Sequence, residues 1–461
     1  MPVAAIFLWL RRRNEPNERC LIIAPLVGLG LLGYVAFFSF VFSPSFGRLF
    51  SYVSIISTAT YVFFVTRRSW LHFHAGGLKY LPALAFSLGL FYLGILYLPA
   101  FHQPYFDQSS LRFIPGLPFD PVIPAVLGDR LFAGEPVRPF MLDWLSSDRP
   151  PLQTGLYLFV LPWLKLLSLP EGLGYQCVGT FCQLFWVPAT WLMMCALCRE
   201  RRVAAAGVLI LAITGFFLLN SVYVWPKLLA GSYVLFAGLL LIDANPHRPR
   251  FALLAGLAAA LGWLAHGGVA FSLIALVPIW VIRGCPYWRK IPVTALLFLL
   301  IAGPWLWYQK FYDPPGDRLL KWHLAGTIPV DSRPLFEVLR TAYSELSWSE
   351  WLDVKLANIR TLFRGRFSQL FDFFTTPGKQ RRMEEFFHFF RAIGVLNPTS
   401  PTGRFEVGKS LISRASIRKV GPTASRRRRA RDGCGAEAAG AGAARAVGGP
   451  ARHRPMVRCG G

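Results

Sequence analysis

The chain has 461 residues, of which 54% are hydrophobic and 15% are aromatic, more than in an ordinary soluble domain. Lys and Arg number 49 against 24 Asp and Glu, which gives a formal net charge of +25. This composition excludes a typical soluble enzyme and predicts an integral membrane protein. Its basic excess then belongs to cytoplasmic loops and anionic lipid headgroups, so we expect membrane lipids and no nucleic acid as partners.

Apolar runs recur along the chain, and a spanning helix needs about 20 such residues. The candidate spans are 20–43, 50–66, 80–100, 153–169, 175–198, 203–221, 227–243, 251–265, 268–283 and 292–309. If 153–169 also crosses, the basic residues "RERR" that follow would face outward, so that segment either lies in the interface or spans. We therefore expect an all-α polytopic protein of nine or ten spanning helices.

The basic clusters orient this array. The positive-inside rule places the arginines at 11–13, the "RERR" at 199–202 and the "RGCPYWRK" at 283–290 in the cytoplasm. The N-terminus is then cytoplasmic, and we expect the protein in the plasma (inner) membrane. Residues 101–152 and those after Gln309 fall on the external face.

These boundaries divide the chain into four predicted regions. N-terminal transmembrane helices occupy 1–79, and a helical module with its external loop at 101–152 occupies 80–309. An external region of surface helices follows at 310–400. The tail, 401–461, is basic and poor in large apolar side chains, which predicts disorder. Its Ala/Gly/Arg composition is equally typical of a shifted reading frame, and both interpretations stay open.

The external loop contains a short helical pattern. In "PVIPAVLGDRLFAG", the apolar residues Val122, Val126, Leu127 and Leu131 share one side of a helix. This spacing predicts an amphipathic helix beside the membrane. Asp120 stands directly before it, where a carboxylate either caps the helix or acts as a general base on a hydroxyl or amine.

A second group of charges lies where this loop enters the next apolar run, at Asp148-Arg149-Pro150-Pro151. The planar guanidinium of Arg149 fits a phosphate oxyanion. The prolines restrict the backbone before the following helix. The alternative is an interfacial arginine whose side chain reaches lipid headgroups.

The stretch "FDPVIPAVLGDRLFAGEPVRPFMLDWLSSDRPPLQTGLYL" resembles the first external loop of membrane glycosyltransferases with the GT-C fold. It is most similar to bacterial protein mannosyltransferases and the lipid A aminoarabinose transferase. Asp120, "LFAGEP" and "DRPPL" follow that family's order and spacing. The resemblance covers about residues 80–330 and implies a GT-C-like helical bundle with external juxtamembrane helices.

Three features depart from that pattern. Arg149 stands where the family usually has Lys, Asp148 stands where Glu is common, and His266 replaces the Lys of a Lys-Gly helix break. The chain also begins with two additional helices and lacks later ones. We assign no role to His266, and an inactive truncated relative stays an alternative.

The resemblance also implies roles for individual residues. Asp120 is expected to be the general base, and Asp148 a second acid that orients the acceptor or Arg149. Arg149 is expected to bind the lipid phosphate. Weaker candidates for the same phosphate, just beyond the apolar run that ends near 309, are Lys310, Lys321 and His323.

The implied activity is inverting transfer of a sugar from a polyprenyl-phosphate donor to an acceptor at the external face. The sequence contains neither a P-loop nor a GxGxxG motif opening a βαβ unit, so nucleotide chemistry is not indicated. We expect no cofactor and no metal, although Asp120 with Asp148 leaves a divalent ion open. The alternative function is a transporter or flippase of a lipid-linked substrate, and the sequence does not predict an oligomeric state.

Overall fold

A computed structural model describes most of the chain before residue 357. The described residues are 2–12, 17–69, 80–98, 108–113, 120–141, 143–170, 172–198, 200–242, 249–282, 284, 288–327, 329–344, 347–353 and 356. They belong to one compact unit, Met1–Lys409, which contains both predicted regions 1–79 and 80–309. The predicted tail, 401–461, lies outside the described residues, as do residues 357–400.

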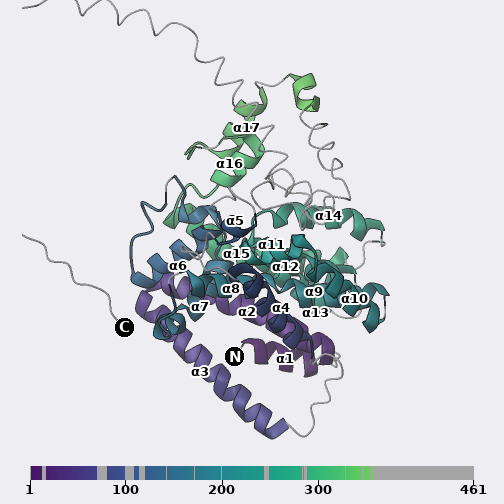
Figure 1. Ribbon diagram of the computed structural model, residues 1–461. Helices are drawn as coiled ribbons and strands as arrows, with labels where there is room; N and C mark the ends of the chain where they lie inside the picture. Colours follow the sequence, from purple (N-terminus) through teal and green to yellow (C-terminus); the bar gives the residue numbers. More distant parts are fainter. Residues whose placement is uncertain are drawn as a thin grey trace, which may run out of the picture. The chain divides into compact units, whose positions relative to one another are not determined.

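The described chain is built of helices and turns, as predicted for an all-α protein. Four shorter turns accompany the helices, at Asp120–Val122, Ser146–Asp148, Trp288–Lys290 and Tyr308–Tyr312. Figure 1 labels most of the helices, which in chain order are α1 (Pro2–Arg12), α2 (Asn17–Phe42), α3 (Pro44–Ser69), α4 (Tyr80–Tyr97), α5 (Gln108–Arg112), α6 (Ile123–Ala133), α7 (Leu152–Leu166), α8 (Leu173–Gln183), α9 (Trp186–Cys198), α10 (Arg201–Ala212), α11 (Gly215–Val222), α12 (Lys227–Ile242), α13 (Pro249–Ala265), α14 (Val269–Ile282), α15 (Ile291–Trp307), α16 (Arg318–Ala325) and α17 (Leu335–Ser344).

Three helical segments of the described residues are long and apolar enough to cross a bilayer: Ile22–Phe42, Leu173–Cys198 and Ile291–Tyr312. A fourth is added if Arg201–Ala212 and Gly215–Val222, bent by 65°, form one span. The predicted nine or ten spans are therefore corrected to three or four in this part of the chain. The remaining apolar helices have 10–17 residues, at most about 26 Å, and do not cover a core of about 30 Å.

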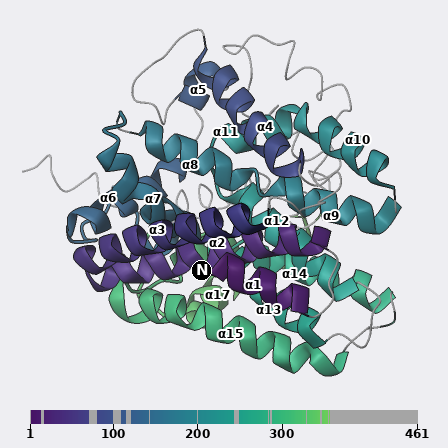
Figure 2. The ribbon, with the colours of Figure 1, turned by 90° about the horizontal axis from the view of Figure 1, so that it is seen from below.

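Two helices near the end of the bundle expose large apolar side chains. In α14, Ile274 and Ile282 are exposed, and in α15 Leu296 and Leu300 are exposed as well. Figure 2 shows α15 at the edge of the bundle. Such a surface is costly in water and is stable against lipid tails, which agrees with a membrane protein.

The interior of the bundle brings N-terminal and later helices together. α2 packs against α7, and α12 packs against α13; Figure 2 shows α2 running beside α7. At the crossing of α2 and α7, a Cβ built on Gly155 would lie 2.0 Å from the carbonyl oxygen of Gly33. Only glycine permits this approach, so the predicted regions 1–79 and 80–309 share one interior.

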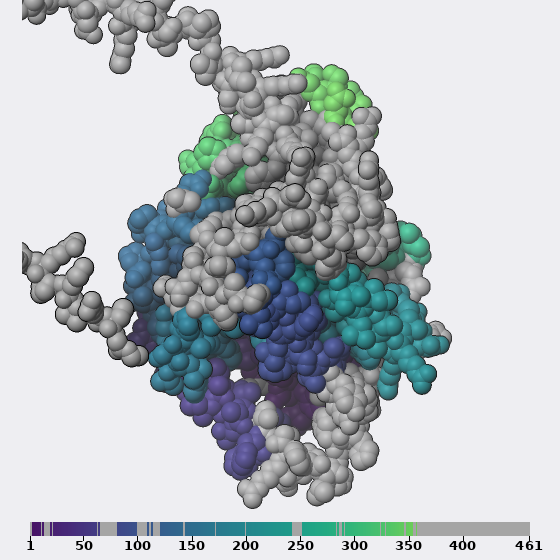
Figure 3. Space-filling model, in the orientation of Figure 1, coloured from purple at the N-terminus to yellow at the C-terminus, as the bar shows by residue number. Residues whose placement is uncertain are grey.

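The apolar run 153–169 forms α7, and the structure places it inside the bundle. Its first eight residues, 152–159, are all buried, and α7 contacts α2, α3, α6 and α8. The two predicted positions of this segment, spanning the membrane or lying in the interface, both stay predictions. The interior also extends to α4, which contacts α8, α9 and α11; Figure 3 shows its blue surface beside the teal surface of later helices.

The helix predicted beside Asp120 is confirmed as α6. Leu127 and Leu131 are buried toward α7, as the apolar spacing indicates. α6 ends at Gly134, whose φ of 77° is left-handed and suits a residue without a side chain. In the predicted external region, the described helices α16 and α17 pack against each other (Figure 1).

Candidate functional site

The segment 143–152 presents two neighbouring charges in different directions. Arg149 has extended backbone angles, φ −119° and ψ 126°, directly after the short turn Ser146–Asp148. Successive side chains of an extended chain point to opposite sides. The Asp148 carboxylate and the Arg149 guanidinium therefore reach different partners, and α7 begins three residues later, at Leu152.

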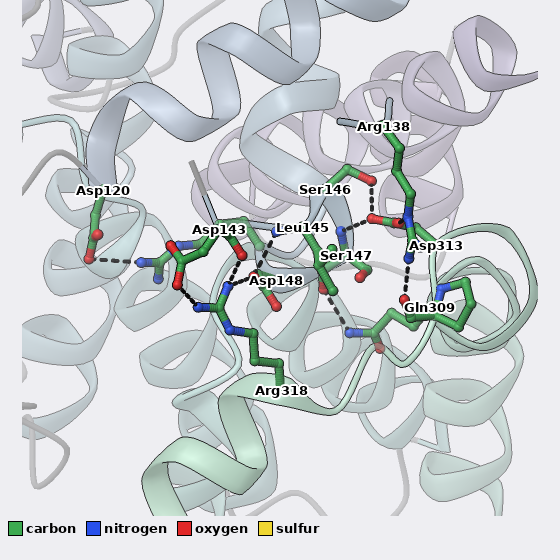
Figure 4. Close-up of polar contacts among 12 residues, drawn as sticks. Asp120, Arg138, Asp143, Leu145, Ser146, Ser147, Asp148, Gln309, Asp313 and Arg318 are labelled. Carbon is green, nitrogen blue, oxygen red and sulfur yellow. Dashed lines mark hydrogen bonds and ion pairs between the residues drawn. The ribbon is translucent and has the colours of Figure 1, made fainter. Parts of the chain in front are cut away.

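Arg149 pairs with the predicted general base. Its Nη2 lies 2.7 Å from Oδ2 of Asp120, and the two side chains are 10% and 19% exposed. Asp120 opens the turn that leads into α6, so the pair joins the starts of α6 and α7. Figure 4 labels Asp120 and marks its ion pair with a dashed line. Two residues that the sequence predicted to act together thus come into contact.

Two tryptophans flank this ion pair. The guanidinium carbon of Arg149 lies 4.8 Å from the ring centroid of Trp144 and 5.9 Å from that of Trp225. Aromatic faces attract cations at such distances, and they also exclude water from the charges. The pair is therefore held in an apolar frame that strengthens its electrostatic interactions.

Trp225 belongs to the turn between α11 and α12, which the sequence analysis did not single out. The same turn ends at Lys227, whose Nζ lies 3.7 Å from the Trp225 centroid. Lys227 interacts electrostatically with both Asp120 and Arg149. In the sequence "YVWPK", a basic residue follows an aromatic-proline pair and opens an apolar run. This pattern is the local signal that could have identified Lys227 as a site residue.

Asp148 lies in a sealed cluster rather than beside Asp120. Its Oδ2 accepts hydrogen bonds from the backbone nitrogen of Leu145 (2.9 Å) and from Nη1 of Arg318 (3.0 Å). Arg318 also donates to the Asp143 carboxylate. The Asp148 side chain is fully buried, and burial raises the pKa of its carboxyl despite these hydrogen bonds and the nearby arginines.

A second buried carboxylate, Asp313, fixes the same loop. Its Oδ2 accepts from the hydroxyl of Ser146 (2.6 Å) and the backbone nitrogen of Ser147 (2.9 Å), and Oδ1 accepts from Arg138. Gln309 donates to the Ser147 carbonyl at 3.1 Å. Figure 4 shows both carboxylate clusters between the loop 138–149 and the segment 309–318.

The three weaker phosphate candidates do not join the Asp120–Arg149 pair in the described residues. Lys321 is buried, with Nζ 2.7 Å from both the Asp331 carbonyl and the Asp317 carboxylate. Lys310 is exposed and lies near the ring of Phe311. His323 lies in α16, and its side chain is outside the described part of the structure.

His266 stands at the break between α13 and α14. Its Nδ1 accepts a hydrogen bond of 3.0 Å from the backbone nitrogen of Gly268. Its ring centroid lies 6.3 Å from that of Trp225. This places it behind the aromatic frame of the site, where it supports the turn at the helix break.

Asp120 and Asp148, the carboxylates considered as ligands of a divalent ion, each face a different arginine. Within the described ranges, no three His, Cys, Asp or Glu side chains gather in an arrangement that could hold a metal ion. Around Trp225 the site contains one carboxylate, Asp120, and two basic side chains, Arg149 and Lys227. This set suits a ligand that carries an anionic group and, beside it, a group that can give up a proton.

The residues that sequence reasoning missed act over long separations. Arg318 and Asp313 lie about 170 positions from their partners in the loop 138–149, and no local pattern marks them. Comparisons with protein-family models, curated proteins and solved structures found no match to this chain.

Proposed function

We propose that the protein is an inverting glycosyltransferase that moves a sugar from a polyprenyl-phosphate donor to an acceptor at the external face of the membrane. The observation that carries the proposal is the partly exposed Asp120–Arg149 pair with its aromatic frame. It combines a carboxylate for general base catalysis with a fork-shaped cation for a phosphate. The resemblance of the loop around it to GT-C enzymes supports the same chemistry.

The proposed reaction balances at these two side chains. The acceptor hydroxyl or amine attacks the anomeric carbon from the face opposite the phosphate, and Asp120 takes its proton. The bond between the anomeric carbon and the phosphate oxygen breaks, and its electron pair stays on the polyprenyl phosphate. Arg149 stabilises the charge that develops there, and the configuration of the sugar inverts.

The burial of Asp148 changes the role proposed for it. A fully buried carboxylate that already accepts from Leu145 and Arg318 does not touch an acceptor. We assign it a positioning role, because it holds the short turn from which Arg149 extends. Lys310 and Lys321 are left out of the proposed phosphate site, since one is exposed and the other is paired with Asp317.

The test replaces Asp120 with Asn in membranes that contain the full chain. Transfer from radiolabelled polyprenyl-phosphate mannose and polyprenyl-phosphate aminoarabinose is measured as new glycosidic product. Loss of a general base lowers the rate by about 10²–10⁴-fold. The matched control is Asp129→Asn on α6, whose carboxylate accepts from Tyr157 at 3.1 Å and which keeps transfer near the wild-type rate.

Unchanged transfer by Asp120→Asn removes the assignment of the base. Vectorial uptake of the labelled lipid without a new glycosidic bond identifies a transporter or flippase instead. Transfer with neither sugar in the wild type, but with loss of donor binding in Arg149→Met, fits the inactive relative.

A further inference from the structure

The turn between α11 and α12 has a strained backbone. Val224 adopts a φ of 50°, a left-handed conformation that β-branched residues rarely enter. Such a conformation costs about 1–3 kcal/mol and persists only where the surrounding structure imposes it. The surrounding contacts must therefore stabilise this turn, and the turn places specific side chains beside the Asp120–Arg149 pair.

A chain of buried hydrogen bonds holds it against the site. Nε2 of Gln153 donates to the Val224 carbonyl at 2.7 Å and to the Tyr175 hydroxyl at 2.7 Å. The Tyr175 hydroxyl in turn donates to the carbonyl of Pro121 at 2.6 Å. Pro121 directly follows Asp120, so one network fixes both the proposed base and the strained turn.

What the turn presents to the site is a cation. The Lys227 ammonium and the Arg149 guanidinium both lie near the ring of Trp225, at 3.7 and 5.9 Å from its centroid. Burial lowers the pKa of Lys227 to about 7; Asp120 acts to raise this pKa and Arg149 to lower it. When the Lys227 amine is protonated, one carboxylate faces two cations and the charge of these three groups is +1.

We propose that Lys227 is a second anion-binding residue of this site and that it shares a phosphate-ester oxyanion with Arg149. An anion between the two cations relieves their repulsion. Arg149 uses one amine on Asp120, and its buried Nε makes no hydrogen bond to another described residue. That Nε supplies a donor beyond the ion pair. The choice of a phosphate ester rests on the proposed function.

The test measures binding to the full chain in detergent micelles by isothermal titration calorimetry. The probes are farnesyl phosphate, inorganic phosphate and farnesol. Lys227→Met weakens farnesyl phosphate binding by about tenfold, as expected for loss of a hydrogen bond between charged groups. Lys227→Arg stays within about threefold of wild type. Lys165→Met, on the exposed last turn of α7, is the matched control and binds as wild type does.

A second measurement needs no variant. Farnesyl phosphate slows acetylation of Lys227 by an acylating reagent, followed by mass spectrometry, while farnesol does not, and Lys165 reacts at the same rate throughout. This arm decides the question if Lys227→Met does not fold, which its melting temperature without ligand reports.

Equal farnesyl phosphate affinity in wild type and Lys227→Met overturns the proposal, and so does a wild type that binds neither phosphate probe. Inorganic phosphate that binds as tightly as farnesyl phosphate, with the same loss in Lys227→Met, supports Lys227 and identifies a free phosphate as the ligand. Weakened binding in Lys227→Met together with unchanged sugar transfer in Asp120→Asn keeps the Lys227 site and removes the proposed glycosyltransferase.

Discussion

Asp148 and Arg149 are adjacent in the chain, yet they lie in environments that differ in burial, charge and partners. Asp148 is sealed against Leu145 and Arg318. The Arg149 side chain is also mostly buried, at 10% exposure, but it faces Asp120, which is 19% exposed, and two tryptophans. Two oppositely charged residues that are adjacent in the sequence therefore need not form an ion pair with each other in the structure. Because the backbone at Arg149 is extended, the Asp148 carboxylate stabilises the loop while the Arg149 guanidinium can bind a ligand.

The two environments also differ in the sign of their charge. The clusters along the loop set three carboxylates, Asp143, Asp148 and Asp313, against Arg138 and Arg318. The Asp148 and Asp313 side chains are fully buried, while those of Asp143 and Arg138 are 64% and 48% exposed. Around Asp120, by contrast, Arg149 and the protonated Lys227 face one carboxylate. Clusters of balanced or negative charge fix the loop, and the excess of positive charge beside Asp120 suits an anion.

We expect the largest loss of stability when Arg318 is replaced. Arg318→Met leaves the Asp148 carboxylate buried without its direct cation, and breaking a buried pair in this way lowers the free energy of unfolding by about 3–5 kcal/mol. Arg149→Met lowers it less, by about 1–2 kcal/mol, because Asp120 is partly exposed and keeps Lys227 nearby. Denaturant unfolding in detergent micelles measures both.

The control for these variants is Arg333→Met, because Arg333 pairs with Asp331 and its side chain is 46% exposed. It lowers the free energy of unfolding least of the three, as expected for a surface pair. Equal destabilisation by Arg318→Met and Arg149→Met would show that the Asp148–Arg318 and Asp120–Arg149 pairs contribute equally to stability, contrary to the prediction.

Removing Asp313 tests the second buried carboxylate that holds the loop 138–149. Asp313→Ala deprives the Ser147 nitrogen of its acceptor and leaves the Ser146 hydroxyl with the Tyr308 hydroxyl alone. A buried donor without a partner costs about 1–3 kcal/mol. Unfolding in detergent micelles reports the loss. Because the loop also carries Arg149, farnesyl phosphate affinity falls with it. A stable variant with wild-type affinity would show that the segment 309–318 does not position the site.

The smallest effect is a difference in the sign of pH dependence. Burial raises the pKa of Asp148, so its contribution to stability is full below its unfolded pKa, about 3.9, and is lost as pH rises through the folded pKa. Hydrogen bonds from Arg333 lower the pKa of Asp331 to about 2. Its contribution is present above about pH 3.9 and is lost as pH falls toward 2.

Melting temperatures between pH 7 and pH 3 check both signs. The gap between wild type and Asp148→Asn widens as the pH falls, and the gap between wild type and Asp331→Asn narrows. Parallel trends for the two variants would show that the Asp148 cluster is as open to solvent as the surface pair.

Local patterns predicted the parts of the site that are encoded locally. Apolar spacing indicated α6, and Asp120 and Arg149, to which the resemblance gave the roles of base and phosphate ligand, lie in contact. The partners of Asp148 were not predictable in this way. Arg318 is 170 residues away, and its contact depends on how the segment after α15 folds back.

The number of spans among the described residues was overestimated for a different reason. Apolar runs were counted as spans by their composition, but several of them, such as 227–243 and 251–265, form helices of 10–17 residues, shorter than the about 20 residues that a span needs. Val224 illustrates a further limit of pattern reading. Valine favours extended structure, and the tertiary hydrogen bond from Gln153 helps to hold it in a left-handed turn.

The glycine crossing of α2 and α7 makes the N-terminal helices part of the scaffold that aims Arg149. Gly155 lies six positions after Arg149 on the helix that begins at Leu152, and Gly33 sits against it without any intervening side chain. A methyl group at either glycine would push the two helices apart and tilt the entrance of α7. An alanine here therefore disturbs the placement of Arg149 from a distance, and a fragment that keeps the Asp120–Arg149 pair in place has to carry α2.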